Sequence, residues 1–390
     1  MPGNELIGSE ELKEVISVFT HGGGVLFGHG FEQRRQNSFK RVQFEKDLTK
    51  FFNCNAVASS SGTASLYTSL RALNVGPGDE VITQSYTFIA TVEAIIAVGA
   101  TPIICNINDT LNMCPEDLKN KITDKTKCII PVHMQGNPAE MDKIISLTSN
   151  NNIKIIEDSC QSIGAKFKGD YVGTIGDLGT FSLDFGKTIT TGEGGVVFTK
   201  NKKLLKFVTS YVDHGHANKK SLPRGDDVAY NCGFNFRMSE LQAAVGIAQL
   251  KKLPFILEQY KKNKSFFKNI IFSELSKKLK FRRITDENEM SDGIIFFMPD
   301  IKSAEKGKNL LIKNNIYFKN LPDAIKWHSA IYWNHIWKNH SFYRKENNRD
   351  WKKSKELMDR SFSFSINILD DFVTLEKKAE KIIKYIKKVI

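Results

Sequence analysis

Lys187 stands in a setting where a lysine amine can become a nucleophile. It follows an apolar run that begins at Phe181 and precedes the turn sequence TTGEGG, after which a second apolar run, 196–199, begins. The pattern predicts a buried strand, a tight turn and a hairpin return to a second strand. A lysine amine that is removed from water loses part of its proton affinity and can attack a carbonyl carbon. Taken alone, however, the segment fits an exposed hairpin lysine better.

Other segments place small, aromatic or acidic residues where apolar runs end. Gly62 sits between Ser61 and Thr63 at the start of a predicted helix. Amides at a helix N-terminus bind phosphate, although small residues there are commonly only caps. Phe88 follows another apolar run, where its ring could lie flat on an aromatic cofactor or simply join the core.

A pair of carboxylates, Glu157 and Asp158, ends a further buried run. A carboxylate in that position needs a positive partner, and a protonated pyridine nitrogen is one that would make the ring a stronger electron acceptor. A helix cap is the competing interpretation. Ser182, five residues before Lys187, is a second candidate phosphate ligand, and Asn235 precedes a predicted helix that it could merely cap.

These features together describe one cofactor. A phosphate cup, a ring-stacking aromatic residue, a carboxylate for a ring nitrogen and an aldehyde-capturing lysine are the parts of a pyridoxal 5′-phosphate (PLP) site. Each part has an ordinary structural explanation by itself, but their combination favours the cofactor.

The elements that must position these residues alternate between strands and helices. Strands are predicted for NAVASSS, DEVITQS, TPIICNI, KCIIPVH, IKIIEDS, GTFSLDF and GGVVFT. Alternation of this kind predicts a largely parallel sheet with helices on both faces and ligands at the carboxyl ends of its strands. A long helix from about residue 235 is expected to break near Pro254. We expect a large domain, 1–250, with an N-terminal arm, 1–35, and a smaller α+β domain, 251–390.

The order of several motifs resembles that of the DegT/DnrJ/EryC1/StrS family of sugar aminotransferases. The motifs are SSGTA, LNVGPGDEVIT, VGATPI, IIPVHMQGNPAEMD, IIEDSCQSIGA, KTITTGEGG and GFNFRMSELQAAVGIAQL, and they run over nearly the whole chain. The resemblance implies an α/β fold of PLP fold-type I, which is like aspartate aminotransferase, with a mostly parallel seven-stranded sheet.

The resemblance also implies a role for individual residues. Lys187 forms the Schiff base with PLP and moves the substrate proton, Asp158 pairs with the pyridinium nitrogen, and Gln161 hydrogen-bonds the cofactor 3′-oxygen. Phe88 stacks on the ring, where many relatives have tryptophan. The implied phosphate ligands are Ser61, Gly62, Thr63 and Ser182, with Asn235 reaching in from the second subunit of a homodimer with shared active sites.

Two features bear on the reaction and the substrate. Family members that dehydrate their substrate have histidine in place of the lysine, so Lys187 favours amino transfer over 3-dehydration. Segments 21–31, 212–227 and 319–335 resemble a subgroup that contains 8-amino-3,8-dideoxy-manno-octulosonate (8-amino-Kdo) transaminase. That enzyme uses glutamate as amino donor for an oxidised Kdo sugar of lipopolysaccharide. The candidate substrate residues in these segments are His214, His216, Arg224, Trp327 and His328.

Alternatives to this function remain open. The acceptor could instead be a nucleotide-linked 3- or 4-ketosugar, and a PLP-dependent dehydratase or a cofactor-binding sensor would share most of the motifs. The candidate histidines could be turn residues, and the tryptophans could belong to the core. No metal site is expected at His214 and His216, because no cysteine or carboxylate partner is evident nearby.

Composition narrows the remaining possibilities. The chain of 390 residues has a formal net charge of +13, with its lysines dispersed over predicted helix faces. No basic stripe interleaved with aromatic residues appears, so an anionic small molecule is a better explanation of the charge than nucleic acid. No signal peptide and no apolar run of about 18 residues is evident, so no membrane span is expected. The six cysteines form no CxxC pair and are interpreted as reduced core thiols of a cytoplasmic protein.

Overall fold

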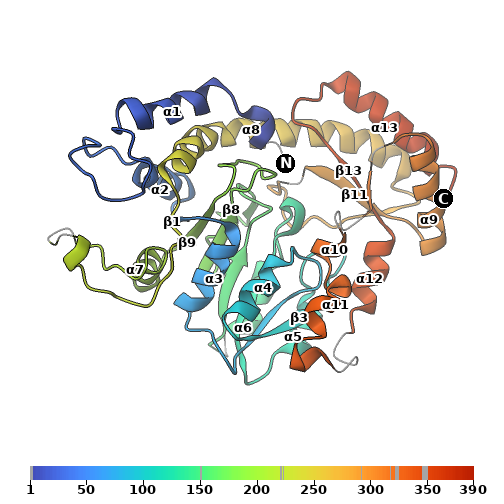
Figure 1. Cartoon of the computed structure of the whole chain (residues 1–390). Coiled ribbons are helices and arrows are strands. Elements are labelled where there is room, and N and C mark those ends of the chain that lie inside the picture. The colour runs from blue at the N-terminus through green and yellow to red at the C-terminus, as the bar shows by residue number, and fades with distance from the viewer. Residues whose placement is uncertain are drawn as a thin grey trace.

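The computed structural model describes most of the chain as an α/β architecture (Figure 1). The described residues are 3–149, 152–219, 222, 224–290, 292–316, 318–320, 325–344 and 350–390. The motifs of the N-terminal two thirds therefore lie almost entirely within them. Part of the candidate substrate segments, at 220–221, 223 and 321–324, lies outside the described residues.

All the apolar runs predicted as strands belong to one seven-stranded sheet with the order β1-β9-β8-β5-β4-β2-β3. Only β9 runs antiparallel to its neighbours in this sheet, and the other pairings within it are parallel. The expected mostly parallel sheet is therefore confirmed. Its strands are β1 (Asn55–Ser59), β2 (Glu80–Gln84), β3 (Thr101–Cys105), β4 (Thr126–Ile130), β5 (Lys154–Asp158), β8 (Leu178–Ser182) and β9 (Gly195–Thr199).

Helices cover both faces of the sheet because successive strand residues point to opposite sides. In β2, for example, Ile82 joins one core and Val81 the other. The first core is shared with α2 (Lys40–Phe52), α5 (Pro115–Lys121), α6 (Met141–Thr148) and α8 (Glu240–Leu275). The second core is shared with α3 (Gly62–Ala72), α4 (Ala90–Ala97) and α7 (Lys202–Tyr211).

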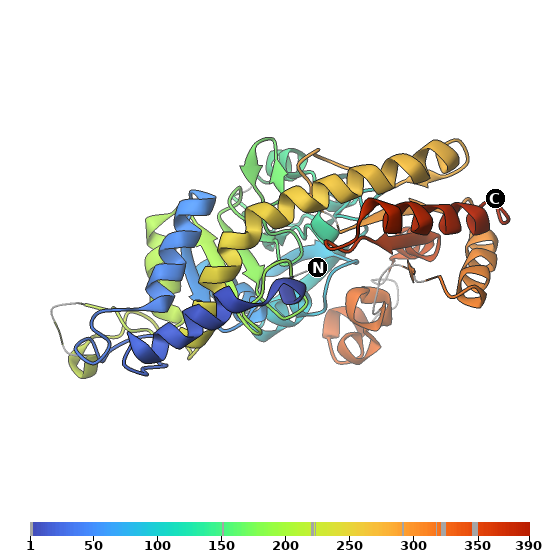
Figure 2. The same cartoon turned by 90° about the horizontal axis from the view of Figure 1, so that it is seen from above.

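The expected break near Pro254 is wrong, because α8 continues unbroken for 36 residues. Figures 1 and 2 show this helix running along much of the molecule, with α1 (Ser9–Thr20) beside its first half and α13 (Phe372–Ile386) beside its last half. An internal proline costs a helix about 3 kcal/mol. Burial of Leu253 and Ile256 next to it stabilises the helix by about 1.5–3 kcal/mol each, which offsets that cost.

The rest of the chain forms a four-stranded antiparallel sheet with the order β10-β11-β13-β12. This agrees with the smaller α+β unit expected there, although the strand β13 was not predicted. The division at residue 250 stays a prediction, since α8 crosses it. The elements are β10 (Lys280–Phe281), β11 (Gly293–Phe297), β12 (Lys319–Asn320), β13 (Ser361–Ser365), α9 (Ile301–Lys313), α10 (Ile325–His328), α11 (Asn334–Trp337) and α12 (Lys352–Asp359).

Short elements complete the described chain. A small hairpin, β6 (Lys166–Phe167) and β7 (Asp170–Tyr171), stands apart from both sheets. The 3₁₀ turns are η1 (Gly3–Leu6), η2 (Met134–Gly136), η3 (Arg224–Asp226), η4 (Ala330–Tyr332) and η5 (Ser341–Arg344). None of the described helices is long and apolar enough to cross a bilayer.

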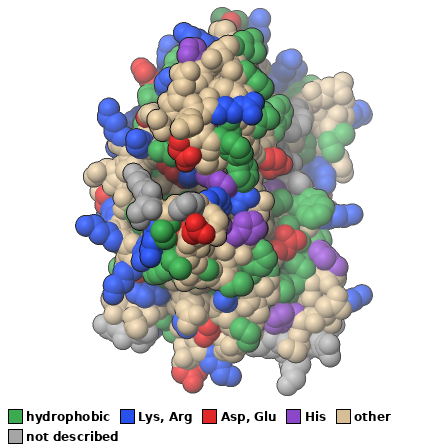
Figure 3. Space-filling view, turned by 60° about the vertical axis from the view of Figure 1, so that its left-hand side comes forward, with side chains coloured by type: hydrophobic (Ala, Val, Ile, Leu, Met, Phe, Trp, Pro, Cys, Tyr) green, Lys and Arg blue, Asp and Glu red, His purple; other side chains and the backbone are tan. Residues whose placement is uncertain are grey.

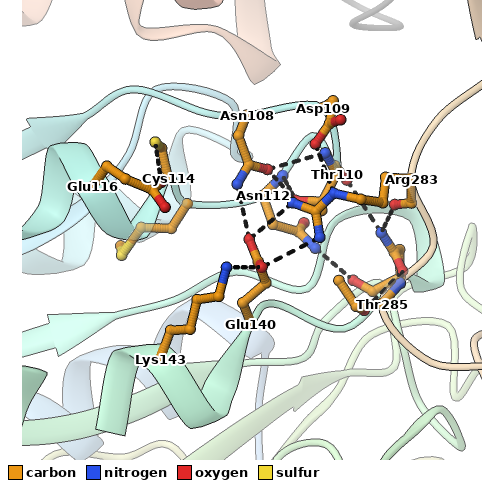
Figure 4. Close-up of polar contacts among 12 residues, drawn as sticks. Asn108, Asp109, Thr110, Asn112, Cys114, Glu116, Glu140, Lys143, Arg283 and Thr285 are labelled. Carbon is orange, nitrogen blue, oxygen red and sulfur yellow. Dashed lines mark hydrogen bonds and ion pairs between the residues drawn. The ribbon is translucent and has the colours of Figure 1, made fainter. Parts of the chain in front are cut away.

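An ion-pair cluster joins the loops of the large sheet to the chain that follows β10 (Figure 4). Arg283 contacts Asp109 at 2.9 Å and Glu140 at 3.1 Å, and Glu140 also contacts Lys143 at 2.8 Å. Burial acts to raise the pKa of Glu140, but hydrogen bonds from Arg283, Lys143 and Asn108 outweigh it and lower the pKa to about 2. The cluster fixes the C-terminal part of the chain against the sheet.

The cysteines agree only partly with their interpretation as core thiols. All six are free. Cys54, Cys105 and Cys128 are buried, and burial raises the pKa of Cys54 to about 11. The other three are half-buried or exposed, because Cys114, Cys160 and Cys232 lie in loops rather than in strands.

Candidate active site

A cavity of about 340 Å³ opens at the carboxyl ends of the parallel strands. Eight of the nine residues predicted to bind the cofactor line it: Ser61, Gly62, Thr63, Phe88, Asp158, Gln161, Ser182 and Lys187. They come from the ends of β1, β2, β5 and β8 and the loops that follow. This is where ligands bind in open α/β sheets. The lining also includes residues that sequence reasoning missed: Leu66, Thr87, Ala90, Thr91, Val132, Cys160, Asp184 and Glu193.

Asp158, the last residue of β5, brings a buried carboxylate into this cavity. Its Oδ2 accepts a hydrogen bond from Thr91 Oγ1 at 2.8 Å, and its Oδ1 accepts one from Cys160 N at 3.2 Å. Thr91 lies in the first turn of α4 and is itself in contact with Thr87. The carboxylate is thus fixed in direction while part of its hydrogen-bonding capacity remains for a cationic ligand. The signal for Thr91 was its position at a helix start just after Phe88.

The start of α3 forms a cup that excludes side chains. Ser61 caps the helix, its Oγ accepting from Ala64 N at 3.1 Å. A Cβ on Gly62 would lie 2.8 Å from Ser182 Cβ and 3.2 Å from Cys160 Sγ, so a larger residue would not fit. Helix N-terminal amides and the hydroxyls of Thr63 and Ser182 around this cradle suit a phosphate group.

Phe88 and His328 face each other across the cavity rim, with ring centroids 5.3 Å apart. The C-terminal segment that carries His328 is docked by backbone bonds, because Thr87 N donates to His328 O at 3.0 Å and Ile89 N donates to Trp327 O at 2.8 Å. Trp327 itself is 54% exposed. Trp333, a little later in the same segment, belongs to the buried core.

The side-chain amide of Gln161 is oriented by the backbone. Its Oε1 accepts a hydrogen bond from Gln135 N at 3.1 Å, which turns the NH₂ group toward other partners. Gln135 has the left-handed φ of 46° and fixes its own side chain by donating from Nε2 to Tyr86 Oη at 2.9 Å. Gln161 is therefore placed to donate a hydrogen bond into the cavity.

Lys187 lies half-buried in the loop between β8 and β9 and lines the cavity. The predicted strand, turn and returning strand are confirmed, since β8 and β9 pair antiparallel. The loop closes on itself, with Lys187 N donating to Asp184 O at 3.0 Å and Thr191 N donating to Leu183 O at 2.9 Å. The amine is thus carried by a hydrogen-bonded turn, and Lys187 lines the same cavity as Asp158.

Five predicted residues do not line this cavity: His214, His216, Arg224, Asn235 and Trp327. Arg224 makes two hydrogen bonds to Asp213, at 2.9 and 2.5 Å, and Arg237 makes a third at 2.7 Å. His216 Nδ1 lies 3.6 Å from Asp227, and Asn235 is exposed. On the face shown in Figure 3, histidine and basic side chains lie together between hydrophobic ones.

The N-terminal loop reaches this arginine cluster. Arg237 lies over the Phe27 ring, 4.9 Å from its centroid. Burial and the charges of Arg224, Arg237 and Arg41 lower the pKa of His29 to about 4, against the opposing charge of Asp213. Burial opposes ionisation of Asp213, but both arginines outweigh it and lower the pKa of that carboxylate. Segments 21–31 and 212–227, which were singled out separately in the sequence, therefore meet.

The residues around the cavity fit PLP. The Gly62 cradle admits a phosphate and no side chain, Asp158 offers a fixed carboxylate, and Phe88 offers a ring at the rim. Lys187 supplies the amine that the aldehyde requires. Within the described chain, no group of three or more His, Cys, Asp or Glu residues could hold a metal ion.

Solved structures share this fold over nearly the whole chain. An aminotransferase from Psychrobacter cryohalolentis aligns over 98% of both chains with a TM-score of 0.84 and 25% identity. NtdA from Bacillus subtilis, solved with the bound cofactor PMP, aligns over 98% of this chain and 84% of its own with a TM-score of 0.80 and 24% identity. Because the second identity is low, that likeness concerns the fold alone.

Curated relatives match shorter stretches. GDP-perosamine synthase of Escherichia coli O157:H7 is 41% identical over 238 residues, which cover 58% of this chain and 64% of the relative. A UDP-N-acetyl-3-dehydro-alpha-D-glucosamine 3-aminotransferase of Acidithiobacillus ferrooxidans is 39% identical over 201 residues, or 51% of this chain and 53% of the relative. The matches thus span between about half and two thirds of these relatives.

The family profile covers far more of the chain. Residues 33–379 match the DegT/DnrJ/EryC1/StrS aminotransferase family. This range contains all the residues that line the cavity. The family is PLP-dependent, which agrees with the cofactor deduced from the residues of the cavity. The chain belongs to the DegT/DnrJ/EryC1/StrS aminotransferase family.

Proposed function

We propose that this protein is a PLP-dependent aminotransferase that moves an amino group from glutamate to an oxo-sugar. The observation that carries the proposal is the presence of Lys187, Asp158 and the Gly62 cradle around one cavity. PLP, when bound, supplies an electron-accepting ring that stabilises negative charge on the substrate carbon. The side chains of the protein hold the cofactor, orient it and move the proton.

Lys187 is proposed to hold the cofactor at rest and to move a proton during each half-reaction. Its Nζ is carried on an ordered loop, so the amine can be released and returned without moving the sheet. Asp158 would keep the ring nitrogen protonated, and Thr91 fixes the carboxylate that does so. Gln161 would donate to the 3′-oxygen with the NH₂ group that Gln135 orients. Lys187, Asp158 and Gln161 thus have different roles, and each is fixed by its own hydrogen-bond partners.

A homodimer with shared active sites belongs to the same proposal. Asn235, His214 and Arg224 lie away from the cavity of their own chain, so a second copy would have to deliver them. The surface near them is rich in exposed hydrophobic side chains, which a partner would cover. These are Leu26, Phe27, Phe31, Leu222, Val228, Tyr230 and Phe234, each at least 40% exposed.

For the acceptor, we propose a nucleotide-linked 3- or 4-ketosugar as the first candidate. The supporting observation is the name of the GDP-perosamine synthase relative, at 41% identity. The net charge of +13 suits a substrate that carries phosphates. Asp213 carries one negative charge against the two positive charges of Arg224 and Arg237, so this cluster keeps a net positive charge with which to bind an anion.

A second candidate acceptor is 8-oxo-3,8-dideoxy-manno-octulosonate, which would give 8-amino-Kdo for lipopolysaccharide. The specific observation in its favour is that segments 21–31 and 212–227, which carry the subgroup resemblance, meet at His29, Arg224 and Arg237. A carboxylate is a suitable partner for such a cluster. Both candidates are anionic sugars, and we propose a cytoplasmic location for the protein.

An acceptor panel tests the proposal. The purified holoenzyme is first given amino acids one at a time, and loss of the visible absorption of the cofactor identifies the donor. Nucleotide-linked ketosugars and free oxo-sugar acids are then added, and amino products are measured by mass spectrometry. Lys187→Ala should form no product with any pair. A stable amino product made at the wild-type rate by Lys187→Ala would refute the proposal.

The same experiment distinguishes an aminotransferase from a dehydratase and from a protein that only binds the cofactor. Ammonia released without a stable amino product would identify a dehydratase, a reaction that Lys187 disfavours. A protein that binds PLP but shows no donor-dependent change in absorption would be a sensor or a binding protein. Product from a free sugar acid alone would select the second acceptor over the first.

A further inference from the structure

The N-terminal segment contacts the backbone of the lysine loop directly. Gly3 is buried, and its N–H donates to the carbonyl oxygen of Lys187 at 2.9 Å. A Cβ on Gly3 would lie 2.7 Å from Lys187 O and 2.9 Å from Thr190 N. The contact therefore depends on a glycine, although the φ of this residue is not in the left-handed region.

A buried side-chain network makes a second contact with the same loop. Thr190 N donates to Gln249 Oε1 of α8 at 3.2 Å, and Gln249 Nε2 donates to Glu11 Oε1 of α1 at 2.9 Å. This arrangement fixes the amide, because only its nitrogen can donate to a carboxylate. Both side chains are almost fully buried, so the contact is made away from bulk water.

Glu11 is in turn tied to its own segment and to α8. Its Oε2 accepts from Gly8 N at 2.7 Å and from Lys252 Nζ at 2.8 Å, and Lys252 Nζ also donates to Leu6 O at 2.6 Å. Lys252 compensates the buried carboxylate. The segment Gly3–Glu11 therefore forms a strap that is anchored on α8 at one end and touches the lysine loop at the other.

The loop that carries Lys187 is the kind of segment whose position depends on contacts with neighbouring elements. It joins β8 to β9 without regular secondary structure, and loops generally open more readily than the elements beside them. A nucleophile misplaced by about 1 Å can lose about 100-fold in rate. The strap and Gln249 bind the loop at Lys187 and at Thr190, which restrains its backbone at two points.

We propose that the strap Gly3–Glu11, together with Gln249, is a positioning element that holds the backbone of Lys187 so that its amine stays directed at the cofactor. This rests on the proposed function of Lys187. The strap does not touch the cavity, since none of its residues lines it, so it acts through the loop alone. A purely structural strap would stabilise the fold without affecting the amine.

The test compares Gly3→Ala with Gly8→Ala in the full chain. The first places a Cβ against the backbone of the lysine loop. Among the described residues, a Cβ on Gly8 would meet only Glu10 Oε2, at an ordinary 3.5 Å, and the variant would keep the N–H that donates to Glu11. We expect Gly3→Ala to speed amide hydrogen exchange of residues 183–191 in the cofactor-free protein. Gly8→Ala should match the wild type, and melting temperatures should agree within about 2 °C.

Kinetic and spectroscopic measurements on the PLP-bound protein then distinguish an effect on the position of the Lys187 amine from an effect on the stability of the fold. In Gly3→Ala we expect kcat to fall by about tenfold with little change in donor KM, and the pH midpoint of the visible absorption of the bound cofactor to move. Gln249→Leu, which removes the Thr190 contact, should shift the same midpoint. Unchanged loop exchange and an unchanged pH midpoint in both variants would overturn the inference.

Borohydride reduction of the wild-type holoenzyme keeps this result distinct from the proposed function. Mass spectrometry should find the reduced cofactor attached to Lys187. If the wild type carries it elsewhere or nowhere, the proposed function fails. If the wild type carries it on Lys187 while the variants behave like the wild type, only the positioning role of the strap fails.

Discussion

Replacing Glu140 by glutamine tests the ion-pair cluster that joins the C-terminal part of the chain to the sheet (Figure 4). Glu140 is 6% exposed and accepts hydrogen bonds from Arg283, Lys143 and Asn108. Its pKa is lowered from 4.5 to about 2. At about 1.4 kcal/mol per unit, this corresponds to about 3 kcal/mol for the ionised form.

Solvent screening reduces this stabilising free energy of the ionised Glu140. Arg283 is 42% exposed and Lys143 is 52% exposed, so screening leaves about 1–2 kcal/mol. Because the pKa in the folded state lies below its value in the unfolded state, the contribution is complete above about pH 5. It falls to about half near pH 3 and is absent below about pH 2. Stability is therefore lost as the pH falls.

The assay is urea unfolding of wild type and Glu140→Gln, followed by fluorescence between pH 7 and pH 3.5. At pH 7 the variant should unfold about 0.3–1 M earlier. The difference between the two proteins should narrow as the pH decreases. Glu305→Gln is the control, because Glu305 is exposed and lies on α9 rather than in this cluster. A difference that is the same at pH 7 and pH 3.5 would show that the charge of Glu140 does not stabilise the junction.

Three further predictions concern the cavity. Asp158→Asn should lower the single-turnover rate with glutamate by at least about 100-fold, because charge stabilisation at the ring is lost; an unchanged rate would remove Asp158 from that role. Thr91→Val deletes one hydrogen bond to the buried carboxylate and should cost about tenfold in the same assay, with normal cofactor affinity. Gly62→Ala places a Cβ 2.8 Å from Ser182 Cβ, and spectroscopic titration should show at least about tenfold weaker PLP binding.

The sequence predicted the sheet and most of the cavity because both follow local patterns. Each of the seven apolar runs became a strand, and parallel strands bring their carboxyl ends to one edge. Residues at those ends, such as Gly62, Asp158 and Lys187, therefore meet without any knowledge of long-range contacts. The strand β13 was missed although its sequence SFSFS alternates with period two, the pattern of a half-buried strand.

Contacts between distant segments could not be predicted in this way. His328 reaches the cavity because its backbone pairs with the loop that carries Phe88, more than 200 residues earlier. The helix α8 passes through Pro254 because partners on both sides bury its neighbours, which a local propensity does not reveal. The candidates Arg224 and Asn235 were grouped with the site by resemblance, and the single chain leaves them outside the cavity.

The two adjacent carboxylates at the end of β5, Glu157 and Asp158, have different roles because they point to opposite sides of the strand. Consecutive residues of a strand face opposite ways. Glu157 accepts four hydrogen bonds, from His133, Gly173, Ile175 and Gly176.

Because Ala139 N donates to His133 Nδ1, the proton of that imidazole lies on Nε2 and is donated to Glu157. The charge of Glu157 is thus satisfied within the protein, and it ties the end of β5 to the loops beside it. Asp158, with donors from Thr91 and Cys160, faces the cavity and retains capacity for a cation. The same strand therefore supplies a rigid anchor and, one residue later, a carboxylate that a protonated ring nitrogen can complete.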